Sequence, residues 1–241
     1  MTTLAVLSDL HGNLSALEAA EADLARRKVD QVIILGDLVG YLTRPNRVVQ
    51  RVALRMAQKG WQTIAGNYDL AVAAGGDEGV QRFLKPGIGE TPRRVFDWTC
   101  EKVNPQIREL LSTLPKSLSF ELSGVPCLAV HGSPDGVRDY VFPDRPQEHL
   151  AAWLEKSGAR CLFMGHTHKP FVRRLPRGLA VNPGSLGYPK DGDPRPSYAL
   201  VNLKSLKAKI VRLDYDLDSE AELLRETGLP ESSVEKLKNG G

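Results

Sequence analysis

Short apolar runs rich in β-branched residues recur along the chain, and five of them end in polar side chains. These runs span residues 4–13 (LAVLSDLHGN), 32–37 (VIILGD), 63–69 (TIAGNYD), 127–132 (CLAVHG) and 161–168 (CLFMGHTH). Each predicts a buried strand that stops at a turn. After the first run, apolar residues from Leu14 to Leu24 recur at helical spacing, and Asn13 can cap that helix. The N-terminal region therefore predicts βαβ order.

The middle of the chain predicts further helices and a hairpin. A helix is expected over residues 45–59, with Pro45 in its first turn. The stretch 70–114 begins with an Ala/Gly-rich segment and predicts helices over 92–102 and 105–114. This helical insert is longer than a simple crossover, so it either carries specificity or is a packed helical connection. Strands over 117–122 and 127–130 and a helix near 146–157 follow.

The C-terminal third predicts more strands and a helical tail. Four segments, 171–175, 179–182, 197–203 and 208–215, are separated by turn residues and predict an antiparallel second sheet. From about Ser219 we expect one or two helices and a frayed Asn-Gly-Gly end. The chain thus predicts an α/β fold, a four-layer α/β/β/α sandwich of two mixed sheets flanked by helices. Residues 1–241 are expected to form a single domain.

Composition narrows the class of protein without naming its chemistry. The chain has 241 residues, enough for one α/β domain, and a net charge of +3 from 32 basic and 29 acidic residues. Its arginines are dispersed, so no specific nucleic-acid binding is expected. The three cysteines are best explained as reduced thiols. The chain enters a strand at once and has no run of 18 apolar residues, so we expect a soluble, cytoplasmic protein without membrane contact.

The polar ends of the five strand-like runs predict a metal site. Ligands bind at the carboxyl ends of strands in open α/β sheets. Taken singly, Asp37 and Asn67 could be turn residues and His131 a buried structural histidine. Together these side chains favour a site large enough for two ions. The candidate ligands are Asp9, His11, Asp37, Asn67, His131, His166 and His168.

The ordered motifs SDLHGN, GD, GNYD, HG and GHTH closely resemble the calcineurin-like metallophosphoesterase superfamily, in particular its small prokaryotic single-domain branch. The resemblance runs from about Leu4 to about Ser185 and includes an NPGS segment at 182–185. It implies that Asp9, His11 and His168 hold one ion. It further implies that Asn67, His131 and His166 hold the other, that Asp37 bridges both, and that Asn13 supports the site from behind the ligands.

The ligand types limit the metals and suggest the chemistry. Imidazole, carboxylate and amide donors suit borderline or hard divalent ions. We expect Mn first, with Fe, Zn, Co, Ni or Mg as alternatives. No cysteine belongs to the set, which argues against a closed structural zinc site. Two ions about 3.5–4 Å apart can share a water and lower its pKa, so that a bridging hydroxide attacks phosphorus.

One residue departs from the family pattern, and the substrate contacts are less defined. Many relatives have a histidine after the metal-binding asparagine, where it protonates the leaving group, and this chain has Tyr68 there. The identity of the general acid is therefore open. Asn182 and Ser185 could contact substrate at the rim or form a rigid Pro-Gly turn. Arg93 and Arg94 could bind a phosphate or be ordinary surface arginines.

Three functions remain in view. The leading prediction is a dinuclear metal-dependent phosphodiesterase that hydrolyses small, nucleotide-like phosphodiesters, 2′,3′-cyclic nucleotides among them. A phosphomonoesterase, a protein phosphatase or a dinucleoside-polyphosphate hydrolase could use the same metals. The third is a non-catalytic interaction scaffold, as one retromer subunit of this fold is, although such scaffolds usually lose ligands. Self-association through the second sheet's edge or the C-terminal helices stays open.

Overall fold

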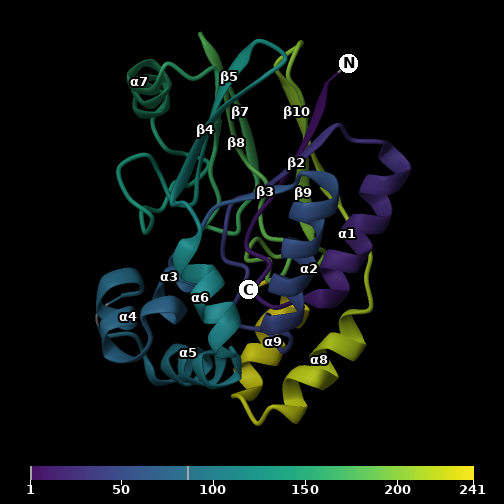
Figure 1. Ribbon diagram of the computed structural model, residues 1–241, viewed down its shortest axis with the longest axis vertical. Coiled ribbons are helices and arrows are strands. Elements are labelled where there is room, and N and C mark those ends of the chain that lie inside the picture. The colour runs from purple at the N-terminus through teal and green to yellow at the C-terminus, as the bar shows by residue number, and fades with distance from the viewer. Residues whose placement is uncertain (1, 86) are drawn as a thin grey trace.

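Two five-stranded sheets form the centre of the protein, which a computed structural model describes over residues 2–85 and 87–241 (Figure 1). The first sheet has the order β10-β9-β1-β2-β3. Its strands β1, β2 and β3 are parallel, whereas β9 and β10 are antiparallel to their neighbours. The bounds are β1 Thr3–Leu7, β2 Gln31–Ile34, β3 Gln62–Thr63, β9 Ser197–Asn202 and β10 Lys207–Arg212.

The second sheet has the order β4-β5-β6-β8-β7 and is also mixed. Strands β5, β6 and β8 run parallel, and an antiparallel strand flanks them on each side. The bounds are β4 Ser117–Leu122, β5 Val125–Val130, β6 Cys161–Phe163, β7 Phe171–Leu175 and β8 Gly178–Asn182.

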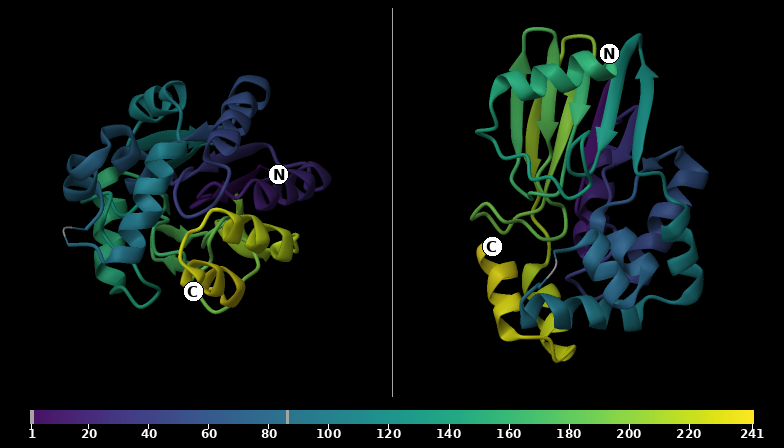
Figure 2. Two further views of the ribbon diagram at one scale, coloured as in Figure 1. Left: turned by 90° about the horizontal axis from the view of Figure 1, so that it is seen from below. Right: turned by 90° about the vertical axis from the view of Figure 1, so that its left-hand side faces the viewer.

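Alternating side chains along the strands build the layers. In β1, Leu4 and Val6 pack between the two sheets, whereas Ala5 and Leu7 face α1 (Leu14–Arg27) and α2 (Pro45–Lys59). The outer face of the second sheet is covered by α7 (Gln147–Ser157). Trp153 of this helix belongs to the buried apolar cluster between the helix and the sheet. Figure 2 shows α7 lying across this face. The four-layer α/β/β/α sandwich is therefore confirmed.

The strands of the C-terminal third are divided between the two sheets, which differs from the prediction. They do not make an antiparallel sheet of their own, because β7 and β8 extend the second sheet while β9 and β10 extend the first. Strand β8 is parallel to β6, with Cys161 opposite Leu179, and β9 is antiparallel to β1, with Thr3 opposite Asn202. Hydrophobic alternation reports which faces of a strand are buried, but it does not report which sheet edge the strand joins.

The insert contains four helices among its described residues: α3 (Asn67–Ala74), α4 (Gly76–Phe83), α5 (Glu90–Lys102) and α6 (Pro105–Thr113). The last two lie where the sequence predicted them. The strand predicted to end at Gly66-Asn67 is present but shorter than expected, because β3 ends at Thr63 and α3 already begins at Asn67. The Ala/Gly-rich composition concealed α3 and α4, since glycine is a weak helix former.

The tail forms α8 (Leu217–Glu226) and α9 (Glu231–Asn239). Both lie at the same end of the sheets as the insert (Figures 1 and 2), and Leu224 and Leu237 share a buried cluster with Val95 of α5. The predicted fraying is wrong, because the carbonyl of Gly240 accepts a hydrogen bond from the Gly192 amide at 2.9 Å. In the described part of the chain, no helix has the length and apolar character needed to cross a membrane.

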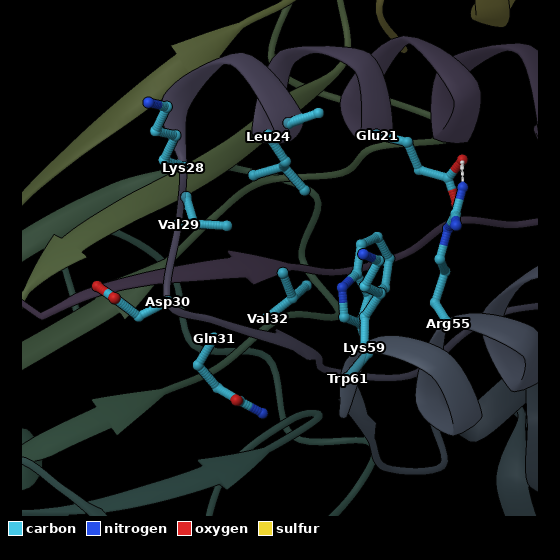
Figure 3. Close-up of a pocket in the computed structure, with 11 residues that line it drawn as sticks. Glu21, Leu24, Lys28, Val29, Asp30, Gln31, Val32, Arg55, Lys59 and Trp61 are labelled. Carbon is cyan, nitrogen blue, oxygen red and sulfur yellow. Dashed lines mark hydrogen bonds and ion pairs between the residues drawn. The ribbon is translucent and has the colours of Figure 1, made fainter.

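Salt bridges join α1 and α2 near the end of the first sheet that lies opposite the candidate ligands. The groove there, between α1, α2 and the start of β2, is lined by apolar side chains such as Leu24, Val32 and Trp61 (Figure 3). At its edge the Glu21 carboxylate accepts hydrogen bonds from Arg51 and Arg55. These bonds join the two helices far from the polar strand ends.

Candidate metal centre

The strand ends that carry the candidate ligands have an unusual backbone. Five of the seven residues have positive φ angles, between 48° and 66°: Asp9, His11, Asp37, His166 and His168. Left-handed backbone is uncommon for residues other than glycine, and it concentrates at functional sites where the surrounding structure imposes it. The turns are also tied to one another, because Asp9 Oδ2 accepts a hydrogen bond from the His166 amide at 3.1 Å.

One buried triad consists of Asp9, His11 and His168. Asp9 Oδ1 lies 3.2 Å from His168 Nε2 and 3.7 Å from His11 Nε2. The two imidazole Nε2 atoms are 3.2 Å apart. Three donor atoms from the ends of β1 and β6 thus converge on one point.

A second buried triad consists of Asp37, His131 and His166. His131 Nε2 lies 3.4 Å from Asp37 Oδ2 and 3.2 Å from His166 Nδ1. Asn67 adds its amide oxygen at 2.9 Å from the same His131 nitrogen. The structure therefore brings all seven candidate ligands together in two adjacent groups.

Asp37 lies between the two triads. Its Oδ2 atom is 3.7 Å from His11 Nε2 of the first triad and 3.4 Å from His131 Nε2 of the second. Its other oxygen accepts a hydrogen bond from the Tyr68 amide at 2.8 Å, which fixes the carboxylate. Gly66 allows this arrangement, because a Cβ atom there would overlap the Asp37 carboxylate.

Backbone carbonyls set the tautomers of three histidines. Nδ1 of His11 donates to Val39 O at 3.0 Å, Nδ1 of His131 donates to Leu35 O at 2.7 Å, and Nδ1 of His168 donates to Tyr188 O. A carbonyl only accepts, so each Nδ1 carries a hydrogen, and in the neutral form of each ring Nε2 turns its lone pair toward the cluster. This is the arrangement by which metal-binding histidines are normally oriented.

Burial and neighbouring charges together set the pKa values of the buried carboxylates and imidazoles. Burial opposes ionisation of Asp9, yet the imidazoles of His168 and His11 hold its pKa well below the usual range. Burial lowers the pKa of His131, but the Asp37 carboxylate outweighs it and raises that pKa to about 9. Burial, together with the charge of Lys190, lowers the pKa of His168 to about 4. At neutral pH without metal, His131 therefore carries a proton and His168 does not.

The donor set fits divalent cations. His11 Nε2 faces His168 Nε2, and His131 Nε2 faces the Asn67 oxygen, so lone pairs would meet unless a proton or metal ion stands between them. Asp9 Oδ1 is buried and has no hydrogen-bond partner among the described residues. Buried acceptors need such a partner. A mixed nitrogen and oxygen set of this kind suits borderline divalent ions.

Three residues support the turns from behind. Asn13 caps α1 by accepting a hydrogen bond from the Ala16 amide at 2.9 Å, and it donates to Gly187 O at 3.0 Å. Ser185 Oγ donates to the Asp9 carbonyl at 2.8 Å, and Asn182 donates to Gly165 O at 2.8 Å. Both Asn182 and Ser185 are fully buried, a position that favours the alternative of a rigid turn over a substrate contact.

The two arginines suggested for phosphate binding lie elsewhere. The guanidinium of Arg93 pairs with Asp97 and Asp77, each at 2.8 Å. Arg94 donates to the carbonyl of Gly228 in the tail at 3.2 Å. Neither lines the cavity over the triads, so the prediction of a phosphate contact at Arg93 is not supported by its position.

A cavity of about 520 Å³ opens over the triads. Its floor includes ligand candidates from both triads, and apolar insert residues such as Phe83 and Ile88 form one wall. The rest of its lining includes residues that sequence reasoning missed: Tyr41, Arg138, Tyr140 and Lys190. No strand-end motif marks them, and they meet only through the fold.

Asp69 was also missed in the sequence, although it fixes two turns. Its carboxylate accepts hydrogen bonds from the amides of Leu38, Val39 and Gly66, at 2.9, 3.2 and 2.9 Å. Burial and the nearby charge of Asp37 raise its pKa to about 7. Its position, three residues after Gly66 at the start of a helix, is a capping signal that could have drawn attention to it.

Tyr68 lies at the cavity, in the first turn of α3. Its ring centroid is 5.5 Å from that of His11 and 4.9 Å from that of Tyr41. Burial, reinforced by Tyr41, raises the pKa of Tyr68 well above its ordinary value of 10. The phenol therefore holds its proton tightly but faces the space above the triads.

Comparison with known proteins agrees with this geometry. The model of the calcineurin-like phosphoesterase superfamily domain matches residues 2–206. A protein of Methanocaldococcus jannaschii described as uncharacterized is 29% identical over 251 residues, which cover 97% of this chain and 96% of the relative.

Two crystal structures share the whole fold. A hypothetical protein from Pyrococcus horikoshii superposes with a TM-score of 0.90 at 26% identity, covering 100% of this chain and 99% of that one. A metallophosphoesterase from Sphaerobacter thermophilus gives a TM-score of 0.80 at 28% identity, with the same coverage.

Proposed function

The chain belongs to the calcineurin-like phosphoesterase superfamily, and we propose that it is a dinuclear metal-dependent phosphodiesterase acting on small, nucleotide-like phosphodiesters. The observation that carries this proposal is the position of Asp37 Oδ2 between two buried His/Asp triads. In this arrangement Asp9, His11 and His168 would hold one ion. Asn67, His131 and His166 would hold the other, and Asp37 would serve both. Mn is the first metal to test.

When bound, two divalent ions lower the pKa of water and offset the negative charge that develops on a phosphoryl group. The protein's own contribution is to orient the donors: the carbonyls of Val39, Leu35 and Tyr188 hold three imidazoles in the binding tautomer. The buried floor also limits the access of bulk water. Both features prepare the site before substrate arrives.

Lys190 is a cation of the cavity lining that could meet a substrate phosphate. Its Nζ atom lies 4.7 Å from the ring centroid of Tyr41 and 3.3 Å from the Tyr41 hydroxyl. None of the described carboxylates forms a salt bridge with it. Lys190 therefore supplies the positive charge that the sequence suggested for Arg93.

Tyr68 favours diesters over alkyl monoesters. General acid catalysis contributes typically 10²–10⁴-fold, and it matters most for poor leaving groups. The raised pKa of Tyr68 makes the phenol a poor proton donor at neutral pH. Aryl diesters and strained 2′,3′-cyclic nucleotides need little protonation of the leaving group. This is why we place them ahead of a phosphomonoesterase or protein phosphatase function.

A scaffold function is disfavoured by the complete ligand set. Every one of the seven candidate ligands is buried and directed into the two clusters. A protein that only bound partners would have no use for two sets of converging lone pairs.

The proposal is tested with bis(p-nitrophenyl) phosphate, the alkyl monoester glycerol 2-phosphate and 2′,3′-cyclic AMP. We expect the Mn-loaded protein to hydrolyse the two diesters faster than the monoester, and chelation to abolish all three activities. A His149→Gln variant is the matched control, because this exposed histidine of α7 lies outside the site. A protein that binds Mn but hydrolyses none of the three compounds would overturn the proposal.

A further inference from the structure

An exposed aromatic pair lies beside the cavity, and one of its members, Tyr140, lines it. The side chains of Tyr140 and Phe142 are 55% and 41% exposed, and both belong to the loop between β5 and α7. Their rings are nearly parallel, with an interplanar angle of 12° and centroids 5.9 Å apart. Exposed aromatic groups next to a functional cavity are typical of ligand-contact surfaces.

The loop holds this pair rigidly. Val141, between the two aromatic residues, is fully buried in the cluster under α7, so its neighbours must point outward. Arg173 of β7 donates to the carbonyls of Pro143 at 3.0 Å and Arg145 at 2.6 Å. Such anchoring lowers the entropy lost when the rings engage a ligand.

The aromatic pair is continuous with the metal centre. The ring of Tyr140 lies 4.3 Å, centroid to centroid, from that of His166, a candidate ligand of the second triad. Tyr140 and Lys190 line the same cavity, and its volume of about 520 Å³ is within the range of small-ligand sites. A phosphate at the triads would therefore have an aromatic surface on one side and a lysine within the same cavity.

We propose that Tyr140 and Phe142 form a stacking surface for a flat aromatic group, such as a nucleobase, of the phosphoester bound at the metals. The inference rests on the proposed function and refines its substrate class. Base stacking on aromatic side chains accepts any base, because every base has a π-face. The surface therefore selects nucleotide-like esters over alkyl esters without discriminating strongly among bases.

Adenosine 5′-monophosphate and ribose 5-phosphate differ only in the base, so their affinities isolate its contribution. We would titrate the Mn-loaded protein with each in a calorimeter and measure released phosphate to confirm that both ligands stay intact. We expect about tenfold tighter binding of the nucleotide, at the lower end of the effect of stacking on one aromatic residue. Tyr140→Ala and Phe142→Ala should each reduce this ratio, and Phe142→Ala should do so while leaving Mn content and ribose 5-phosphate affinity unchanged.

Phe142→Ala is the more decisive variant. Among the described residues, the ring of Tyr140 packs against the candidate ligand His166, whereas the ring of Phe142 packs against Tyr140. Leu54→Ala is the matched control, an exposed apolar residue of α2 outside the cavity. Equal affinities in the native protein, or an unchanged ratio in both aromatic variants, would overturn the stacking surface. A base preference without diester hydrolysis would instead overturn the proposed function alone.

Discussion

At the scale of single residues, the sequence indicated which side chains gather at the site but not how they are held. Asp9, Asp37 and His131 each followed a recognisable apolar run, so their convergence could be predicted. The left-handed backbone of five candidate ligands could not, because it arises from hydrogen bonds between turns far apart in the chain. Lys190 and Tyr140 were missed for the same reason, since only folding brings them to the triads.

Substitution of Tyr68 tests its role as a weak acid. Tyr68→Phe should change turnover of an aryl diester less than threefold, because p-nitrophenolate leaves without protonation. Tyr68→His should raise turnover of alkyl esters by about tenfold, within the usual contribution of a general acid. Steady-state kinetics on methyl p-nitrophenyl phosphate and dimethyl phosphate separates the two effects. Loss of all activity in Tyr68→Phe with metals retained would show instead that the hydroxyl is essential.

The raised pKa of His131 predicts that one ion binds with strong pH dependence. Below its pKa of about 9, this imidazole must lose a proton before it can bind metal, so affinity at its triad rises about tenfold per pH unit. His168, with a pKa of about 4, has no such proton to lose near neutrality. Activity should accordingly fall as the pH decreases below about 9, because the ion at the His131 triad binds progressively more weakly.

Calorimetric titration with Mn at pH 6, 7 and 8 checks this expectation. One of the two binding steps should strengthen about 100-fold across the range, with release of one proton, while the other changes less. His149→Gln should leave both steps unaltered. Two steps with the same pH dependence would contradict the charge assignment.

At the scale of elements, hydrophobic periodicity predicted the positions of strands and long amphipathic helices well. It predicted poorly which strands pair with one another. Helix α2 lies where the sequence placed it, with Pro45 in its first turn. Strand β3 has only two residues, and Asn67, which we expected to end a strand, instead begins α3. Strand β9 pairs with β1 on one edge and with β10 on the other, and both its faces are buried, so the sheet that it joins is a property of the assembled layers.

The α1–α2 contact gives a stability prediction remote from the metals. Burial raises the pKa of Glu21, but hydrogen bonds from Arg55 and Arg51 outweigh it and lower the pKa below its ordinary value of 4.5. The stabilisation is therefore complete above pH 4.5 and is lost as the pH falls through the lower, folded-state value. Glu21→Gln should destabilise the protein by about 1 kcal/mol at pH 7.

Urea unfolding at pH 7 and pH 3 measures this difference, which should shrink at the lower pH. Glu18→Gln is the matched control, because Glu18 is half exposed and lies 3.6 Å from Arg51 in a looser pair. A destabilisation by Glu21→Gln that is the same at both pH values would show that charge is not its cause.

At the scale of the whole molecule, the layered architecture followed from the sequence, whereas the shape of the cavity did not. The insert and the tail pack together at the end of the sheets that carries the site, and Tyr188, whose carbonyl accepts a hydrogen bond from His168, donates one to the Ser233 carbonyl of α9 at 2.9 Å. We propose that both additions belong to one domain with the sandwich. The cavity depends on contacts between segments more than 40 residues apart, which no local pattern encodes.

A single domain predicts one cooperative unfolding transition. Tryptophan fluorescence and far-ultraviolet circular dichroism should give coincident urea curves, because tail, insert and sheets share buried clusters. Two separated transitions would show that the tail or the insert unfolds independently.

The central claim is that one carboxylate, Asp37, joins two metal sites. The most direct test is the metal content of the purified, Mn-loaded protein and of its Asp37→Ala variant, measured by mass spectrometry on samples with verified folding. We predict two ions per native chain, at most one in the variant, and no hydrolysis of bis(p-nitrophenyl) phosphate by the variant. Two ions and near-normal turnover in Asp37→Ala, or a single ion in the active native protein, would contradict the account.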